Sequence, residues 1–228
     1  MDLTGKVVLV LGATSTTGNE LVLSFLQKGA AVIALGKDKT KLEKLSDIAQ
    51  KNGFEIVLLH LDITKHAMLP VMANSIFERF GKLDYVVNLL AYSSESMPLL
   101  HINDDVIIKS INTNITSQIL LLKYISPLME KSQSPVFVHF SCKWTQEMAY
   151  NLLFNAGKAA VESAINDWKK EIVNPNLQLE IYTPEAFASK TRRKIYPDEN
   201  HDNLPKPIDI IEKLFKILDN KQLENIEG

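Results

Sequence analysis

The chain has 228 residues, of which 46% are hydrophobic and 23% are charged, and its formal net charge at pH 7 is −2. This length suffices for one α/β domain with a sizeable core, so we expect a single domain over residues 1–228. The balanced charge gives nucleic-acid binding no electrostatic basis, and no apolar run approaches the length of a membrane span.

The single cysteine, Cys142, cannot form an intramolecular disulfide, and the N-terminal residues show no signal-peptide pattern. We therefore expect a cytoplasmic protein. No metal site is expected.

The first element is an apolar run from Val7 to Leu11 without alternation, which is typical of a strand buried on both faces of a parallel sheet. A turn bounded by Gly12 and Gly18 follows, and an amphipathic helix is expected over 20–28 with Gly29 as its C-terminal cap. The turn presents backbone N–H groups at a helix N-terminus, which favours an anion such as a pyrophosphate. A dinucleotide is the natural candidate.

This strand and helix unit then repeats along the chain. Further strands are expected over 30–35, 56–61, 83–90, 136–140 and 177–182, and further helices up to residue 52, over 69–80, over 104–129 with an interruption at 110–117, over 151–173 and over 207–219. The pattern dissolves at 185–206, which we expect to be a mobile loop on the substrate side. Six such units predict a doubly wound parallel sheet with helices on both faces.

Three motifs follow the first, fourth and fifth strands. They are Gly12-Ala13-Thr14-Ser15-Thr16-Thr17-Gly18, Asn88-Leu89-Leu90-Ala91 and Phe154-Asn155-Ala156-Gly157-Lys158. With them the chain resembles the short-chain dehydrogenase/reductase family over nearly its whole length. The resemblance implies a single Rossmann-like domain that binds NAD or NADP.

The resemblance assigns the phosphate end of the cofactor to the first turn. Thr16 stands where the family has its middle glycine, so a branched side chain approaches the ribose-phosphate region. Asp62, next to Ile63, corresponds to an aspartate that faces the adenine amino group, although an ordinary capping aspartate would look the same. The turn residues implied in binding are Gly12, Thr14, Ser15, Thr16, Thr17 and Gly18.

Other cofactor positions depart from the family pattern. Asn88 is expected to tie neighbouring strands together, and Ala91 replaces a glycine beside the cofactor ribose. Lys37 stands where an acidic residue would select NAD, so we expect NADP(H) to be favoured over NAD(H), unless Lys37 merely begins a solvated charge run. Pro184 matches the proline after the sixth strand, but the glycine that should follow it is Glu185.

In the family, a hydride moves between nicotinamide and a carbonyl or alcohol carbon while a tyrosine hydroxyl transfers the proton. The tyrosine position holds Phe154, which has no proton to give, so a loss of about 10²–10⁴-fold is expected. Lys158 matches the lysine and Ser141 the substrate-binding serine, with Cys142 in the second place of a Ser-Ser pair. Asn114 matches the asparagine of the water relay.

Several alternatives stay open at this stage. Asn112 is a nearby rival of Asn114, and Tyr150 could replace the missing hydroxyl only if Lys158 reached it across two helical turns. Ser189 lies near the position of a cofactor-contacting threonine. The charged run 192–194 is a solvated surface or, less simply, a site for an acidic substrate.

Two functions are compatible with these residues. One is an NADP(H)-dependent oxidoreductase with a degenerate site and low activity on a small carbonyl or alcohol. The other is a catalytically silent module that binds a dinucleotide or a partner protein. The resemblance also implies a homodimer or homotetramer paired through the long helix and the helix of Lys158.

Overall fold

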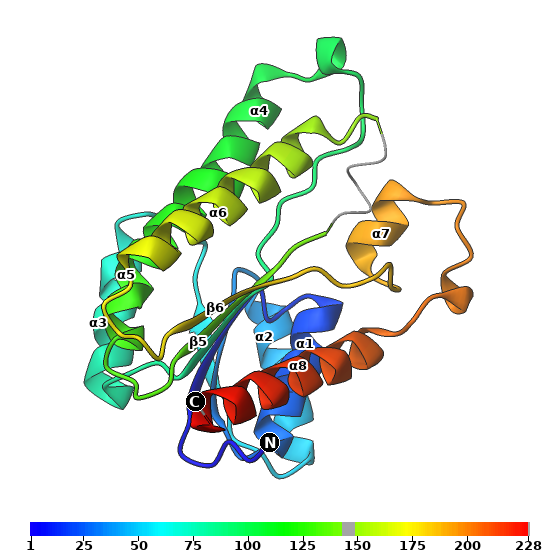
Figure 1. Cartoon of the computed structure of the whole chain (residues 1–228). Coiled ribbons are helices and arrows are strands. Elements are labelled where there is room, and N and C mark those ends of the chain that lie inside the picture. The colour runs from blue at the N-terminus through cyan, green and yellow to red at the C-terminus, as the bar shows by residue number, and fades with distance from the viewer. Residues whose placement is uncertain (143–148, 228) are drawn as a thin grey trace.

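Six parallel strands form one sheet in the order β3-β2-β1-β4-β5-β6 (Figure 1). The computed structural model describes residues 1–142 and 149–227, with side chains described as far as Asp219. The strands are β1 (Val7–Leu11), β2 (Ala31–Gly36), β3 (Val57–His60), β4 (Tyr85–Asn88), β5 (Val136–Phe140) and β6 (Gln178–Tyr182). The predicted doubly wound sheet is confirmed.

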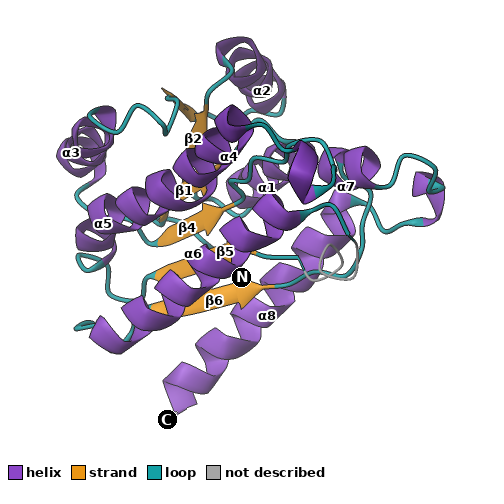
Figure 2. Ribbon diagram, turned by 90° about the horizontal axis from the view of Figure 1, so that it is seen from above, coloured by secondary structure: helices purple, strands orange, loops and turns teal. Residues whose placement is uncertain are grey.

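Helices cover both faces of this sheet, as Figures 1 and 2 show. One core cluster joins the sheet to α1, α2 and α8, and the other joins it to α3, α5 and α6. Both faces of β1 are buried, which explains its unbroken apolar sequence. The helices are α1 (Thr16–Gln27), α2 (Lys39–Lys51), α3 (Met68–Phe80), α4 (Asp104–Ile111), α5 (Ser117–Met129), α6 (Leu152–Glu171), α7 (Lys190–Ile195) and α8 (Pro207–Glu227).

The first helix begins at Thr16, one turn earlier than the sequence pattern indicates. Ser15 caps it, because its side chain accepts a hydrogen bond of 2.9 Å from the backbone N–H of Gly18. Gly18 therefore lies inside the helix. A Cβ atom there would stand 2.4 Å from the carbonyl oxygen of Gly12, so glycine lets the helix press against the turn.

The expected interruption of the long helix is confirmed. Residues Asn112–Thr116 form a π-helical turn between α4 and α5. Gly157 of α6 faces this turn so closely that a Cβ atom would stand 2.6 Å from Cβ of Asn114. This contact brings the motif on α6 to the edge of the sheet.

The segment 185–206, in which the sequence pattern indicates no regular structure, contains α7 and a short 3₁₀ turn, His201–Asn203. Ser189 caps α7, and the buried guanidinium of Arg192 donates two hydrogen bonds of 2.6 Å to the carboxylate of Glu199. Lys194 donates to the carbonyl oxygen of Ser93, 2.8 Å away. The charged run thus makes intramolecular contacts at two of its three positions.

We expect Gly18→Ala to lower the free energy of unfolding by about 2–3 kcal/mol, because the added methyl group meets backbone atoms of Gly12 and Ala13 that cannot yield cheaply. Urea unfolding measures the change. Gly53→Ala is the control: its added Cβ meets nothing within 4 Å, so only the penalty of a φ of +79° remains, about 1 kcal/mol. Equal losses in the two variants would contradict this packing.

Candidate functional site

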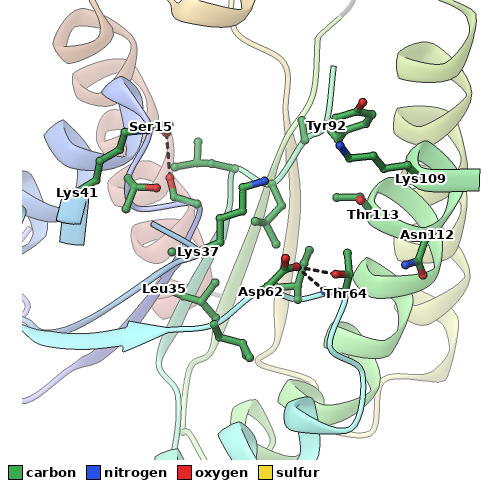
Figure 3. Close-up of a pocket in the computed structure, with 18 of the residues that line it drawn as sticks. Ser15, Leu35, Lys37, Lys41, Asp62, Thr64, Tyr92, Lys109, Asn112 and Thr113 are labelled. Atoms are coloured by element: carbon green, nitrogen blue, oxygen red, sulfur yellow. Dashed lines mark hydrogen bonds between the residues drawn. The ribbon is translucent and has the colours of Figure 1, made fainter. Parts of the chain in front are cut away.

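A cavity of about 560 Å³ opens at the carboxyl ends of the strands (Figure 3). Its walls come from the turns after β1, β2, β3 and β4 and from one face of α4. The chain order reverses between β1 and β4, and open α/β sheets bind ligands at such a switch point.

The turn after β1 lies between this cavity and a second one of about 120 Å³. Gly12 adopts a φ of +83°, and the hydroxyl of Ser15 donates to its carbonyl oxygen over 2.9 Å. Thr14 lines the first cavity, whereas Thr16 and Thr17 line the second. The N-terminus of α1 therefore presents its dipole where the two cavities meet.

The two cavities share walls, so one ligand can occupy both. Ser15, Leu89, Ala91 and Lys190 line both of them. A molecule with two bulky ends and an anionic middle fits this arrangement, because the N-terminus of α1 and Lys190 lie where the two cavities meet. The residues present thus fit a dinucleotide.

Several lysines line the larger cavity, together with Asp62 and Asp105. Lys37 and Lys41 line it beside the end of β2, and Figure 3 shows Lys37 reaching across it. Lys109 lies on the α4 side, with its ammonium group 4.9 Å from the ring centre of Tyr92. Gly36 leaves room for the side chain of Thr14 at this end of the cavity, because a Cβ atom at Gly36 would stand 2.6 Å from Cγ2 of that threonine.

Asp62 closes its own turn and lines the cavity together with Ile63. Its carboxylate accepts hydrogen bonds from the N–H of Thr64 at 3.0 Å and from its hydroxyl at 2.7 Å. Burial opposes ionisation, but the bonds from Thr64 and the charges of Lys37 and Lys65 outweigh it and hold the pKa of Asp62 below its usual value. The capping and adenine-facing interpretations are compatible in this geometry.

Asn88 does tie neighbouring strands together. Its amide nitrogen donates to Oε1 of Gln118 at 2.8 Å and to Nδ1 of His139 on β5 at 3.2 Å. Its oxygen accepts from the N–H of Leu90 at 3.0 Å, which shapes the chain leading to Ala91. His139 was missed by sequence reasoning, and burial together with the charge of Lys158 lowers its pKa well below the usual value.

Lys158 and Phe154 meet in the wall of the smaller cavity. The ammonium group of Lys158 donates to the carbonyl oxygen of Phe140, 2.5 Å away, at the end of β5. Burial lowers the pKa of Lys158 to about 8, although the nearby groups of Cys142 and Glu162 favour its charged form. Lys158 occupies the sheltered position that the sequence predicts, since the residue is only 8% exposed.

Ser141 and Cys142 both line the smaller cavity and both are buried. The backbone N–H of Ser141 donates to the carbonyl oxygen of Tyr182 at 2.8 Å, and its hydroxyl donates to the carboxylate of Glu162. Sequence reasoning missed Glu162. Its position four residues after Lys158, on the same face of α6, was the available signal.

Asn114 lies beside these residues, where a narrow gap is lined by Asn114, Phe154 and Lys158. Its side-chain oxygen accepts from the N–H of Tyr92 at 2.7 Å, and its nitrogen donates to the carbonyl oxygen of the same residue at 2.8 Å. The rival Asn112 lines the larger cavity instead. The two asparagines therefore serve different ends of the site.

Tyr150 is 58% exposed and is not among the residues that line either cavity, so the structure gives it no contact with the site. Pro184 and Ser189 line the smaller cavity as expected. Glu185 does not, because its carboxylate pairs with Lys213 of α8. Glu185 thus points to α8 and not into the smaller cavity.

Two negative findings apply to the described part of the chain. No group of His, Cys, Asp and Glu side chains there could hold a metal ion. No helix there combines the length and apolar character needed to cross a membrane.

Comparison with known proteins agrees with this geometry. Residues 6–200 match the family model described as short chain dehydrogenase. The 11-beta-hydroxysteroid dehydrogenase A of Sesamum indicum is 25% identical over 201 residues, which cover 86% of this chain and 56% of that protein. The chain thus spans little more than half the length of this curated relative.

Solved structures share the fold. A protein of Escherichia coli CFT073 assigned to the short chain dehydrogenases and complexed with NADPH matches with a TM-score of 0.87 at 23% identity, covering 93% of this chain and 90% of that one. A metagenomic short-chain oxidoreductase in complex with NADP gives a TM-score of 0.80 at 18% identity, covering 94% of this chain and 90% of that one.

We expect Lys158→Met to raise the free energy of unfolding by about 1–2 kcal/mol at pH 7, because the folded protein then no longer buries an ammonium group. The pKa of about 8 in the folded state lies below the ordinary 10.5, so between these values the unfolded chain binds a proton that the folded chain does not. The free energy of unfolding of the wild type therefore rises with pH in this range. The advantage of the Lys158→Met variant over the wild type shrinks accordingly from pH 8 towards 10.5.

Urea unfolding at pH 7 and pH 10 measures both effects. Lys169→Met is the control, since Lys169 is exposed on the same helix and its change is expected to stay within about 0.5 kcal/mol. Destabilisation by Lys158→Met at pH 7 would show that the buried ammonium group supports the fold instead of straining it.

Proposed function

Because the chain belongs to the short-chain dehydrogenase family, we propose that it is an NADP(H)-dependent oxidoreductase of low activity that acts on a small carbonyl or alcohol. The observation that carries this proposal is the pair of adjoining cavities with the N-terminus of α1 between them. The larger cavity suits an adenosine moiety and the smaller one a nicotinamide, beside Ser141 and Lys158.

Charge supports a preference for NADP(H) over NAD(H). Lys37 and Lys41 line the cavity just after β2, at the place where an acidic side chain would repel a 2′-phosphate. Lysine meets a phosphate as a point charge on a flexible stem, so both side chains can adjust to it.

The residues that line the smaller cavity support an oxidoreductase of low activity. A bound nicotinamide supplies the acceptor or donor of a hydrogen with its two electrons. Lys158 holds a positive charge there at neutral pH, and the oxygen of Ser141 can accept a hydrogen bond from a substrate hydroxyl group. Phe154 fills the wall without a hydroxyl group, so a carbonyl oxygen receives no proton from that position.

The second candidate is a silent module that binds a dinucleotide or a partner protein. Phe154 is the observation that favours it, because an apolar ring closes the site where the family donates a proton. Thr16 and Ala91 add side-chain atoms to the cavity walls in place of glycines. Nucleotide binding is common to both candidates, so turnover separates them.

Pairing through α5 and α6 is part of the proposal. A groove of about 810 Å³ runs between these helices and is lined on the α5 side by Ile119, which is 44% exposed, and on the α6 side by Trp168. Contact with a second copy would cover these apolar groups. The single cysteine supports a reducing, cytoplasmic setting.

Calorimetric titration with NADPH, NADP, NADH and NAD tests the binding half of the proposal. We expect micromolar binding of NADPH and at least a tenfold loss of NADPH affinity in Lys37→Asp, because a carboxylate then faces the 2′-phosphate. Lys39→Asp is the matched control, since it makes the same charge change at a residue outside the cavity lining. Failure of all four nucleotides to bind would overturn the proposal.

Phe154→Tyr tests the reason for low activity. A hydroxyl group added beside Lys158 restores a proton donor, so NADPH-dependent reduction of small aldehydes is expected to rise about 10²-fold or more. The rate of NADPH loss across an aldehyde panel measures it, with Phe80→Tyr on α3 as control. A variant that binds NADPH normally but gains no reductase activity would favour the silent module.

A further inference from the structure

The hydroxyl group of Ser141 already donates a hydrogen bond within the protein, to Glu162. It lines the smaller cavity, yet its proton is directed at the carboxylate of Glu162 behind the cavity wall. A hydroxyl oxygen has two lone pairs that remain free to accept. Ser141 can therefore accept a hydrogen bond from an alcohol in the cavity while it donates to Glu162.

Glu162 is placed to exchange a proton with water. Ser141 is only 6% exposed, whereas Glu162 is half-buried on the outer side of that contact. The described titratable groups around Glu162 are Lys158, one helical turn before it, and two groups that act on that lysine, His139 on β5 and Cys142 just after β5. Lys158 carries the charge opposite to that of the Glu162 carboxylate.

We propose that Glu162 is the proton acceptor of this site and acts through Ser141 in the oxidation of a small alcohol. This proposal rests on the proposed oxidoreductase function. It gives the site an acid–base group that does not depend on the residue at position 154.

The step balances in atoms and electrons. The alcohol O–H bond breaks as its proton passes to Oγ of Ser141, and the hydroxyl proton of Ser141 passes to Glu162. The C–H bond breaks with its electron pair going to an oxidised nicotinamide, which is the oxidant, and a C=O bond forms. The proton then leaves Glu162 for water.

The cavity walls set the substrate class. Phe140, Phe154 and Phe187 line the smaller cavity together with Ser141 and Lys158, so the apolar part of an alcohol would contact aromatic rings while its hydroxyl group reaches Ser141. The direction of the reaction follows from the hydrogen-bond pattern: Ser141 donates to a carboxylate, which can accept a proton, whereas carbonyl reduction needs a proton donor.

The first experiment compares wild type with Glu162→Gln in NADP-dependent alcohol oxidation across pH. We expect Glu162→Gln to lose at least 100-fold in kcat and to change the pH profile of the rate, because an amide group cannot accept the proton. Glu162→Asp should recover part of the rate. Glu78→Gln is the matched control, because the carboxylate of Glu78 accepts a side-chain bond from Asn74 on α3 but lies outside both cavity linings.

The second readout needs neither nucleotide nor substrate. In infrared spectra of the nucleotide-free protein, the carboxylate band lost in Glu162→Gln should shift in Ser141→Ala, because its hydrogen-bond donor is gone. The band should stay in place in Cys142→Ala. A band that ignores Ser141→Ala would overturn the inferred contact.

The third comparison uses Phe154→Tyr as background. Once a tyrosine hydroxyl can take the proton, Glu162→Gln should cost at least tenfold less than it does in the wild type. An equal cost in both backgrounds would show a purely structural role and overturn the inference.

Failure of the inference is distinguishable from failure of the proposed function. Alcohol oxidation with an unchanged rate and pH profile in Glu162→Gln overturns the role of Glu162 alone. A wild-type protein that binds NADP but oxidises no alcohol and reduces no carbonyl overturns both.

Discussion

The buried ammonium group of Lys158 is the constraint on which the site depends. Its Nζ atom lies 2.5 Å from the carbonyl oxygen of Phe140, so a hydrogen bond joins the C-terminal end of β5 to the middle of α6. Burying a charge is costly unless it is paired, and here the compensation comes from that carbonyl and from the charges near it. The close approach of Gly157 to Asn114 makes this geometry possible, because any larger side chain would push α6 away.

The neighbours of Lys158 follow from the same constraint. His139 lies within electrostatic reach and stays neutral, since a second buried cation would add to the cost. Glu162 lies on the solvent side of the lysine and Ser141 lies on the cavity side. Lys158 and Ser141 thus line the smaller cavity together with Phe154, whose ring adds no polar group to it.

The sequence allowed the architecture and most of the site wall to be predicted. Apolar runs such as Val7–Leu11 are readable because a strand covered on both faces must be apolar at every position. The site lies at the carboxyl ends of these strands, so Gly12, Asp62 and Ser141 could be placed at one edge of the sheet without coordinates. Local rules suffice for such residues.

The remainder depends on contacts between distant segments. The contact of Ser141 with Glu162 and the pairing of Glu185 with Lys213 join residues 21 and 28 positions apart, and no local pattern specifies them. The helix α7 was missed for the same reason, because its charged residues look solvated until Glu199 folds back on Arg192. Polar residues that pair with one another in the tertiary structure leave no periodic signal.

The short helix α7 has a mechanical consequence for the whole site. Lys190 lines both cavities, Lys194 is bonded to the chain after β4, and the pair of Arg192 with Glu199 holds the helix to the turn behind it. These contacts connect α7 and that turn as one piece. Any displacement of this piece therefore reshapes the walls of both cavities at once, so the two ends of a bound molecule would sense each other through the protein as well as through their own covalent bonds.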